Sequence, residues 1–152
     1  MIFGAKNSDS IMSDEFAVKF KIETSYEGYE NLAVDSSVDI VYIGSINSTH
    51  YELCKLFLNA GKHVACEKTF CLTLSQTEQI YALAKEKNLF IMEAFWTAFL
   101  PSFAKANEII RSGLLGKIRF VQASLGYPVS EIEKIKNPQL GGGGLLNLGV
   151  YR

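Results

Sequence analysis

Three short runs of apolar residues divide the middle of the chain at regular intervals. They cover residues 38–43, 63–66 and 89–92, include several β-branched residues, and are apolar on both sides of a strand's alternation. Buried strands of a parallel sheet have this pattern, because helices cover both faces of the sheet. We therefore predict three parallel strands in a sheet that is covered on both sides.

Helical patterns occupy the intervals between these runs. Residues 51–60 place apolar side chains on one face of a 3.6-residue period, and Gly61 follows where a left-handed cap is needed. A second helix is predicted over residues 74–86. Two overlapping capping boxes leave its first residue open: Thr73 with Gln76, and Ser75 with Glu78. This alternation of strands and helices with short joints is typical of a right-handed parallel β/α sheet.

The two ends of the chain have less regular patterns. Before the first run we expect a strand at residues 1–5, a helix at 14–20 that Ser13 caps, and a helix at 29–34. After the last run, the pattern predicts a helix at 101–112, a strand at 118–125, a loop at 127–140 and the beginning of a helix at 145–151.

The predicted strand at 118–125 has no later strand with which to pair. Either the chain is incomplete at both ends, or this strand joins another sheet or another chain, because unpaired buried backbone is costly. The fold class that we expect is α/β. An incomplete Rossmann-like parallel sheet occupies residues 1–98, and the start of an α+β substrate domain occupies residues 99–152.

Composition and charge narrow the class of protein. Of the 152 residues, 48% are hydrophobic and 20% are charged, and the net charge of −1 gives no reason to expect nucleic acid or a membrane surface as a partner. The cysteines are odd in number and lack zinc-ligand spacing, so we expect reduced thiols, no metal site and a cytoplasmic location.

Three groups of residues carry candidate chemistry, and each also has a structural interpretation. Residues 44–50 follow the first run and lead into a helix, as cofactor loops do, although a simple capping loop has the same composition. Lys68, after Glu67 at the end of the second run, can stabilise a developing alkoxide or can simply be solvated. Tyr151, four residues after Asn147 and behind four glycines, can transfer a proton or can belong to the core.

Taken together, these motifs resemble the glucose–fructose oxidoreductase and inositol dehydrogenase (Gfo/Idh/MocA) family. The similarity is greatest to its branch of dimeric dihydrodiol dehydrogenases and NADP-dependent xylose dehydrogenases. It covers the whole chain and rests on the order and spacing of the motifs VDIVYIG, AGKHV, CEK, MEAFWT with FLP, and the segment from Gly141 to Tyr151.

The resemblance implies roles for individual residues. Lys68 and Tyr151 would be catalytic, with Tyr151 moving the proton while Lys68 lowers the tyrosine's pKa. Trp96 and Asn147 would face the substrate. The remaining residues would bind NADP, with NAD as the alternative: Lys6, Ser45, Asn47, His50 and Glu67. The reaction would transfer a hydride between NADP and a hydroxyl-bearing carbon of a sugar or a trans-dihydrodiol, in a protein that forms a homodimer through its C-terminal sheet.

Some positions depart from the family pattern. Thr69 replaces the proline of a Glu-Lys-Pro motif, Asn147 replaces an aspartate, Ala98 stands where arginine is common, and the 152 residues lack the glycine-rich turn that binds pyrophosphate. A rival hypothesis is therefore a non-catalytic remnant that binds a full-length homologous subunit. A third is an unrelated small α/β domain, which a sheet without the predicted parallel order would favour.

Overall fold

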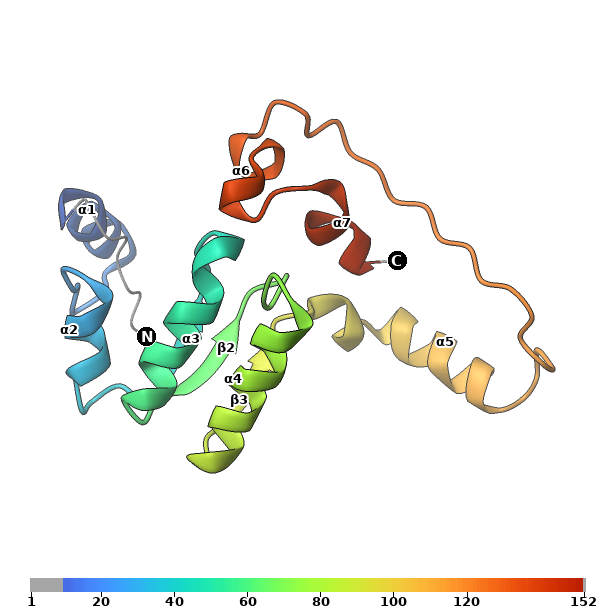
Figure 1. Cartoon of the computed structure of the whole chain (residues 1–152), viewed down its shortest axis with the longest axis horizontal. Helices are drawn as coiled ribbons and strands as arrows, with labels where there is room; N and C mark the ends of the chain where they lie inside the picture. Colours follow the sequence, from blue (N-terminus) through green and yellow to red (C-terminus); the bar gives the residue numbers. More distant parts are fainter. Residues whose placement is uncertain (1–9, 152) are drawn as a thin grey trace.

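A computed structural model describes residues 10–151, and for residues 10–14 it describes the backbone alone. The strand expected at residues 1–5 and the cofactor residue Lys6 lie outside the described residues. The described chain consists of a small parallel sheet with its helices, followed by an extended C-terminal part that returns to the sheet (Figure 1).

The sheet contains the three predicted strands. These are β1 (Ile40–Ile43), β2 (His63–Cys66) and β3 (Ile91–Glu93), arranged in the order β1-β2-β3 with both pairs parallel. All three strands therefore end at the same edge of the sheet, where ligands bind in open parallel sheets. The parallel order that the sequence predicts is confirmed, and the third hypothesis, an unrelated domain without this order, is excluded.

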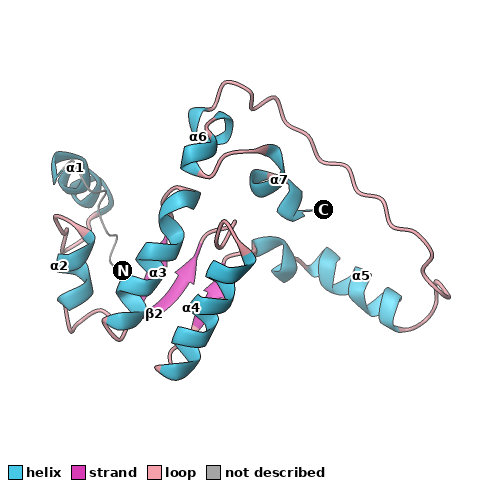
Figure 2. Ribbon diagram, viewed as in Figure 1, coloured by secondary structure: helices cyan, strands magenta, loops and turns pink. Residues whose placement is uncertain are grey.

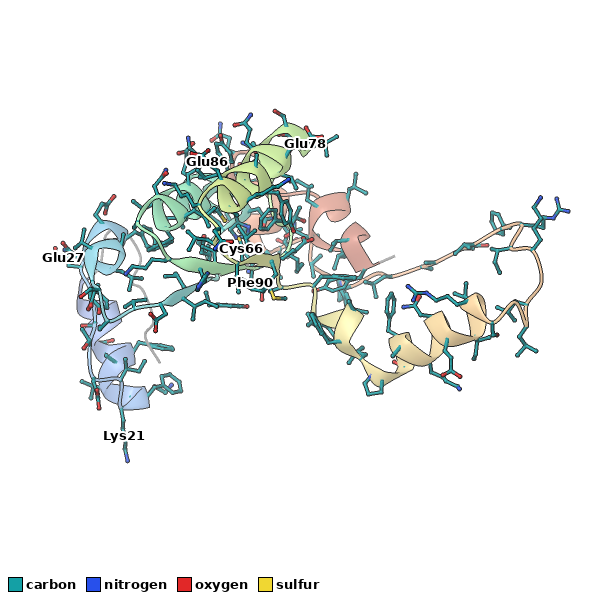
Figure 3. The ribbon with its side chains drawn as sticks, turned by 90° about the horizontal axis from the view of Figure 1, so that it is seen from below. Lys21, Glu27, Cys66, Glu78, Glu86 and Phe90 are labelled. Carbon is teal, nitrogen blue, oxygen red and sulfur yellow. The ribbon has the colours of Figure 1, made fainter. Side chains whose placement is uncertain are left out.

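Helices α3 (His50–Asn59) and α4 (Leu74–Glu86) connect the strands and cover one face of the sheet (Figures 1 and 3). Thr73 is the N-cap of α4, and its hydroxyl accepts a hydrogen bond from the backbone N–H of Gln76 at 3.2 Å. The structure thus selects the first of the two capping boxes. Gly61, with φ of 79°, ends α3 in the left-handed conformation that the sequence predicts.

The opposite face of the sheet is uncovered by any of the described elements. Ile40 and Tyr42, which point to this face from β1, each remain 55% exposed. The prediction of a sheet covered on both sides is therefore wrong for the described residues. Apolar residues at successive strand positions show that a face favours burial, but they do not supply the element that buries it.

The core lies between the sheet and α3 with α4. Its most deeply buried side chains are Leu32, Cys54, Phe57, Leu58, Val64, Cys66 and Ile80. The three cysteines are all buried and unpaired, as expected for reduced thiols. The pKa of the Cys66 thiol is raised by its hydrogen bond with Cys54 and by burial, so this thiol is unreactive at neutral pH.

From residue 10 onward, two helices precede the sheet. The helix α1 (Ser10–Phe20) begins earlier than predicted, so Ser13 lies within it and the prediction that Ser13 caps a helix is wrong. The helix α2 (Tyr29–Val34) has the predicted bounds. Asp35, at its C-terminal end, accepts hydrogen bonds from the hydroxyl of Tyr26 and, at 2.7 Å each, from the backbone N–H and the hydroxyl of Ser37.

Replacement of Asp35 by asparagine is expected to remove a pH-dependent part of the stability. The hydrogen bond from Tyr26, followed by those from Ser37, lowers the pKa of Asp35 from 3.8 to about 2. Because the folded-state pKa is lowered, this stabilisation is present above pH 3.8 and is lost as the pH falls towards 2. Urea unfolding should therefore show that the Asp35→Asn variant has a lower free energy of unfolding than the unchanged chain at pH 7, and that this difference is smaller at pH 2.

Asp39→Asn is a matched control for this measurement. Asp39 is exposed, and its side chain makes no hydrogen bond within residues 15–151. The free energy of unfolding of Asp39→Asn should differ little from that of the unchanged chain at either pH. If this difference shrank in acid as much as it does for Asp35→Asn, the effect could not be assigned to the Asp35 hydrogen bonds.

The C-terminal part differs most from the sequence-based prediction. After η2 (Trp96–Phe99) and α5 (Pro101–Arg111), residues 117–129 form no strand but an extended exposed segment, in which Phe120 and Val121 are each 79% exposed (Figure 2). The predicted strand at 118–125 is wrong for the described chain, because a strand needs a hydrogen-bonded neighbour and none of the described strands lies beside it.

The segment after this extended stretch folds into short helical turns. These are α6 (Glu133–Lys136), η3 (Pro138–Leu140), α7 (Gly144–Asn147) and η4 (Gly149–Tyr151). Residues 127–140 were predicted to be a loop, and the structure adds α6 and η3 within them. The single helix predicted at 145–151 is interrupted at Leu148, whose φ and ψ of −120° and −32° leave the helical region. Within residues 10–151, no helix has the length and apolar character needed to span a bilayer.

Candidate active site

Four of the predicted site residues meet at the carboxyl edge of the sheet. Lys68 follows β2, Trp96 begins η2 after β3, and Asn147 and Tyr151 arrive from α7 and η4. The last two are about eighty residues away from Lys68 in sequence, and they reach it because the chain returns to the sheet after its long extended segment (Figure 1). The sequence could not predict this return from its hydrophobic pattern.

Lys68 is the centre of this group. Its Nζ donates a hydrogen bond to the backbone oxygen of Asn147 at 2.8 Å and lies 5.1 Å from the centroid of the Tyr151 ring. A cation at this distance from an aromatic ring is attracted to it. An ammonium has three N–H donors, so the bond to Asn147 leaves donors for a bound substrate. The peptide bond between Lys68 and Thr69 is cis.

Tyr151 is held by two aromatic neighbours. The indole N–H of Trp96 donates a hydrogen bond to the Tyr151 hydroxyl oxygen at 3.0 Å. The ring centroid of Phe95 lies 5.7 Å from that of Tyr151, and the Trp96 centroid lies 6.0 Å away. A donor aimed at the phenol oxygen stabilises negative charge on it. The resemblance places Trp96 in the substrate pocket, and the structure adds a direct contact with the candidate proton-transfer group.

The surroundings of Lys68 change its pKa in both directions, with burial as the largest cause. Burial lowers the pKa of Lys68 below its ordinary value of 10.5, and the neighbouring charge of Lys134 lowers it further, while the carboxylates of Glu67 and Glu93 oppose this shift. A lysine that is partly removed from water in this way is a more reactive acid than a solvated one.

Glu67 belongs to a second contact that sequence reasoning missed. Its carboxylate accepts a hydrogen bond from the hydroxyl of Tyr42 on β1, and its other oxygen accepts from the backbone N–H of Lys68 at 3.1 Å. Burial and the hydrogen bond to Glu67 raise the pKa of Tyr42 to about 12. Tyr42 pairs with Ala65 in the sheet, so the alternation of side chains brings it beside Glu67, two residues on. The alternation can be predicted from the sequence, but the register that pairs Tyr42 with Ala65 cannot.

The loop after β1 uses its polar side chains within the protein. In this loop, which contains η1 (Asn47–Thr49), the hydroxyl of Ser45 accepts from Thr49 at 2.7 Å, and the side-chain amide of Asn47 donates to the backbone oxygen of Gly141 at 2.9 Å. His50 is fully buried, with Nδ1 2.7 Å from the backbone oxygen of Thr69 and Nε2 3.2 Å from that of Ser45. The ring of His50 therefore has no exposed atom that could contact a cofactor.

The glycine segment also serves internal packing. A side chain at Gly141, where φ is +75°, would place its Cβ 2.6 Å from Cβ of Asn47 and 2.8 Å from a methyl carbon of Leu72. Glycine is therefore required at this position so that the returning segment can approach the loop after β1. The predicted close approach of backbone is present, but at Gly141 it is to protein and not to a ligand.

Asn147 is buried, and its side chain bonds to the backbone of its own helical turn. Its amide donates to the backbone oxygen of Gly143 at 2.9 Å, so it is the carbonyl of Asn147 that faces Lys68. An asparagine that bonds to the backbone of its own helical turn competes with helix continuation. This bond accompanies the interruption of the predicted helix after Asn147. Its role as a substrate-binding side chain stays a prediction.

The donor set fits the reacting end of a nicotinamide site. An ammonium, a phenol and an indole N–H converge beside the ends of parallel strands, where such cofactors present their nicotinamide ring. The partner of this end, a Gly-x-Gly-x-x-Gly turn that binds pyrophosphate, does not occur in the 152 residues. The parallel β/α sheet itself is of the Rossmann-like class.

Comparisons with known proteins place the chain more narrowly. Residues 2–95 match the model of an oxidoreductase family with an NAD-binding Rossmann fold, Gfo/Idh/MocA, and the chain belongs to this family.

Relatives and solved structures agree with this assignment. A trans-1,2-dihydrobenzene-1,2-diol dehydrogenase of Danio rerio is 35% identical over 139 residues, covering 91% of this chain and 42% of the relative. A D-xylose 1-dehydrogenase (NADP(+)) of Hypocrea jecorina is 36% identical over 161 residues, covering 97% and 41%. The structure of a 3-ketoreductase from Actinomadura kijaniata with NADP, 29% identical, matches 99% of this chain and 46% of its own with a TM-score of 0.80. The chain thus spans about two fifths of the length of these two relatives.

Proposed function

We propose that this chain carries the reacting half of an NADP-dependent dehydrogenase for a polyhydroxy substrate, an aldose or a cyclic trans-diol. The contact that supports this most is the placement of Tyr151 between the ammonium of Lys68 and the indole N–H of Trp96. NADP, with NAD as the alternative, is supported by the names of the D-xylose dehydrogenase and of the 3-ketoreductase complex. A cytoplasmic location is part of the same proposal.

The side chains divide the chemistry between hydride and proton. A bound nicotinamide would supply the acceptor for the hydride that leaves the hydroxyl-bearing carbon of the substrate. Tyr151, in its deprotonated form, takes the proton from the substrate hydroxyl as the substrate C–H bond breaks and so becomes the neutral phenol, and the indole N–H of Trp96 donates to its oxygen. Lys68 donates to the substrate oxygen with an N–H that Asn147 does not use.

The remaining predicted residues would hold the cofactor and substrate in place. Glu67, fixed by Tyr42 and by the backbone of Lys68, would accept a hydrogen bond from the nicotinamide ribose. Ser45 and Asn47 would shape the loop beside it through their internal hydrogen bonds. Trp96, which is 57% exposed, would present the rest of its ring to the substrate.

The direct test incubates the 152-residue chain with NADP and either D-xylose or a trans-dihydrodiol, and follows NADPH by its absorbance. A titration of the chain with NADPH is the second measurement, read through quenching of Trp96, the single tryptophan of the chain. The proposal expects saturable quenching together with slow NADPH formation. Absence of both, with NAD as well as NADP, would contradict it.

A second candidate function is a non-catalytic subunit that binds a full-length homologue. It is supported by the exposed apolar residues of the segment that follows α5: Leu114, Leu115, Phe120, Val121 and Tyr127. In the homologue this partner surface would be the C-terminal sheet of the expected homodimer. Co-purification of the two chains, with unchanged cofactor binding in the homologue, would favour this function, whereas a strictly monomeric chain would exclude it.

A further inference from the structure

Three hydrogen bonds tie the C-terminal segment to the edge of the sheet. Asn47 donates to the backbone oxygen of Gly141 at 2.9 Å, and Lys68 donates to that of Asn147 at 2.8 Å. The third bond runs from the hydroxyl of Thr69 to the backbone oxygen of Leu146. Lys68 and Thr69, which are adjacent at the end of β2, thus bond to the adjacent backbone carbonyls of Asn147 and Leu146 in α7.

The bond from Thr69 is the most rigid of the three. A threonine side chain has one rotatable bond before its hydroxyl and is restricted at that bond, whereas the lysine side chain has four carbons between its backbone and its ammonium. The backbone of Thr69 is itself fixed, because its carbonyl oxygen lies 2.7 Å from Nδ1 of the fully buried His50. Thr69 therefore transmits the position of the sheet edge to Leu146 without a flexible link.

The position of Leu146 decides where Tyr151 lies. Asn147 and Leu148 donate backbone hydrogen bonds back into α7, to Gly143 and Gly144 at 3.1 and 2.9 Å, and Tyr151 donates to Leu148 at 3.1 Å. These bonds make α7 and η4 one short connected unit that ends at the Tyr151 ring. A shift of α7 away from Thr69 would thus move the Tyr151 hydroxyl away from Trp96 and Lys68.

We propose that Thr69 is a positioning residue, whose hydroxyl holds α7 on the strand end and thereby keeps Tyr151 in contact with Trp96 and Lys68. The corresponding position of the Glu-Lys-Pro motif carries a proline, which has no hydroxyl, so this attachment belongs to this chain's own sequence. The inference rests on the proposed function in one respect only, namely that Tyr151 transfers the proton.

The test uses the single tryptophan as a reporter of this contact. In a ¹⁵N-labelled sample the Trp96 indole N–H gives one resonance, and the Tyr151→Phe variant shows where this resonance lies when the hydroxyl partner is missing. Thr69→Val, which keeps the branched shape and removes the hydroxyl, is expected to shift the resonance towards that reference position. Thr69→Ser, which restores a hydroxyl, is expected to return it to the position in the unchanged chain.

Thr77→Val is the matched control. The hydroxyl of Thr77 also bonds to a backbone oxygen, that of Thr73 at 3.2 Å, but this bond lies within α4 and involves none of Trp96, Lys68 and Tyr151. This variant should leave the indole resonance unchanged. If Thr69→Val destroys the fold, as seen by loss of the Val64 and Ile80 methyl resonances, the pair Thr69→Ala and Thr69→Ser decides the same question.

The proposal is overturned if Thr69→Val, or Thr69→Ala in its place, leaves the indole resonance where it is while Tyr151→Phe moves it. This measurement needs no cofactor, so its result is independent of whether the chain transfers hydride. Where turnover is measured as well, Thr69→Val is expected to lower kcat by about 10- to 100-fold, because misplacement of a reacting group by about an ångström has effects of this size. KM for NADP should stay unchanged.

Discussion

Tyr151→Phe is expected to lower the rate of hydride transfer by about 10²- to 10⁴-fold, the range in which a positioned general acid or base contributes. The ring contacts with Phe95 and Trp96 are retained by phenylalanine, so the change removes the hydroxyl and little else. The affinity for NADP should be unaffected, since no predicted cofactor residue contacts this hydroxyl in residues 15–151. The measurement is kcat from NADPH absorbance, with KM for NADP in parallel.

Tyr127→Phe is the control for this substitution. Tyr127 is 62% exposed in the extended segment between α5 and α6, and it makes no described side-chain contact with the Lys68 group. Its replacement should leave kcat unchanged. If both variants were equally active, Tyr151 would not be the proton-transfer group, and the placement between Lys68 and Trp96 would have to be explained as packing.

The sheet and its helices could be predicted because each depends on nearby residues. The cap at Thr73 is formed with a residue three positions away, and the left-handed residue Gly61 follows directly from the end of its helix. The parallel order likewise follows from short strands joined by helices. The cap and the terminating glycine each depend on only a few neighbouring residues, and the structure confirms both.

Four of the predicted site residues meet in the structure, namely Lys68, Trp96, Asn147 and Tyr151, but their contacts could not be predicted. Lys68 and Tyr151 were identified through motif spacing, whereas the bonds that Trp96, Thr69 and Asn47 make link residues 55 to 94 positions apart. No hydrophobic period specifies such pairs. The prediction of a strand at 118–125 was wrong for a related reason. Its pattern shows that these residues favour a strand, but none of the described elements pairs with them.

His50 lies in a predicted cofactor motif, but its position in the structure does not suit the predicted role. The family resemblance implies a cofactor contact for His50, the first residue of α3, but the ring is buried and both nitrogens face backbone oxygens, those of Thr69 and Ser45. His50 thus connects the loop after β1 to the end of β2, and this connection depends on the register of the strands.

Lys68→Met is expected to lower hydride transfer by about 10²- to 10³-fold, the loss seen when one donor to a developing oxyanion is removed. Methionine preserves most of the length of the side chain without its charge. Lys55→Met is a closely matched control, because Lys55 also lies over a tyrosine ring, 4.9 Å from the centroid of Tyr51, but on the outer side of α3. The control should retain full activity, and equal losses in both variants would contradict a catalytic role for Lys68.

The same substitution should change the pH dependence of stability in a defined direction. Burial, together with Lys134, lowers the folded-state pKa of Lys68 below 10.5 against the opposing charges of Glu67 and Glu93. Between this lowered pKa and 10.5 the unfolded chain binds more protons than the folded chain, so the unchanged protein gains stability with rising pH. Lys68→Met lacks this gain. Urea unfolding from pH 7 to pH 10.5 should therefore show that the free energy of unfolding of the unchanged chain rises relative to that of the variant. A constant difference between the two free energies would mean that Lys68 is as well solvated in the folded chain as in the unfolded one.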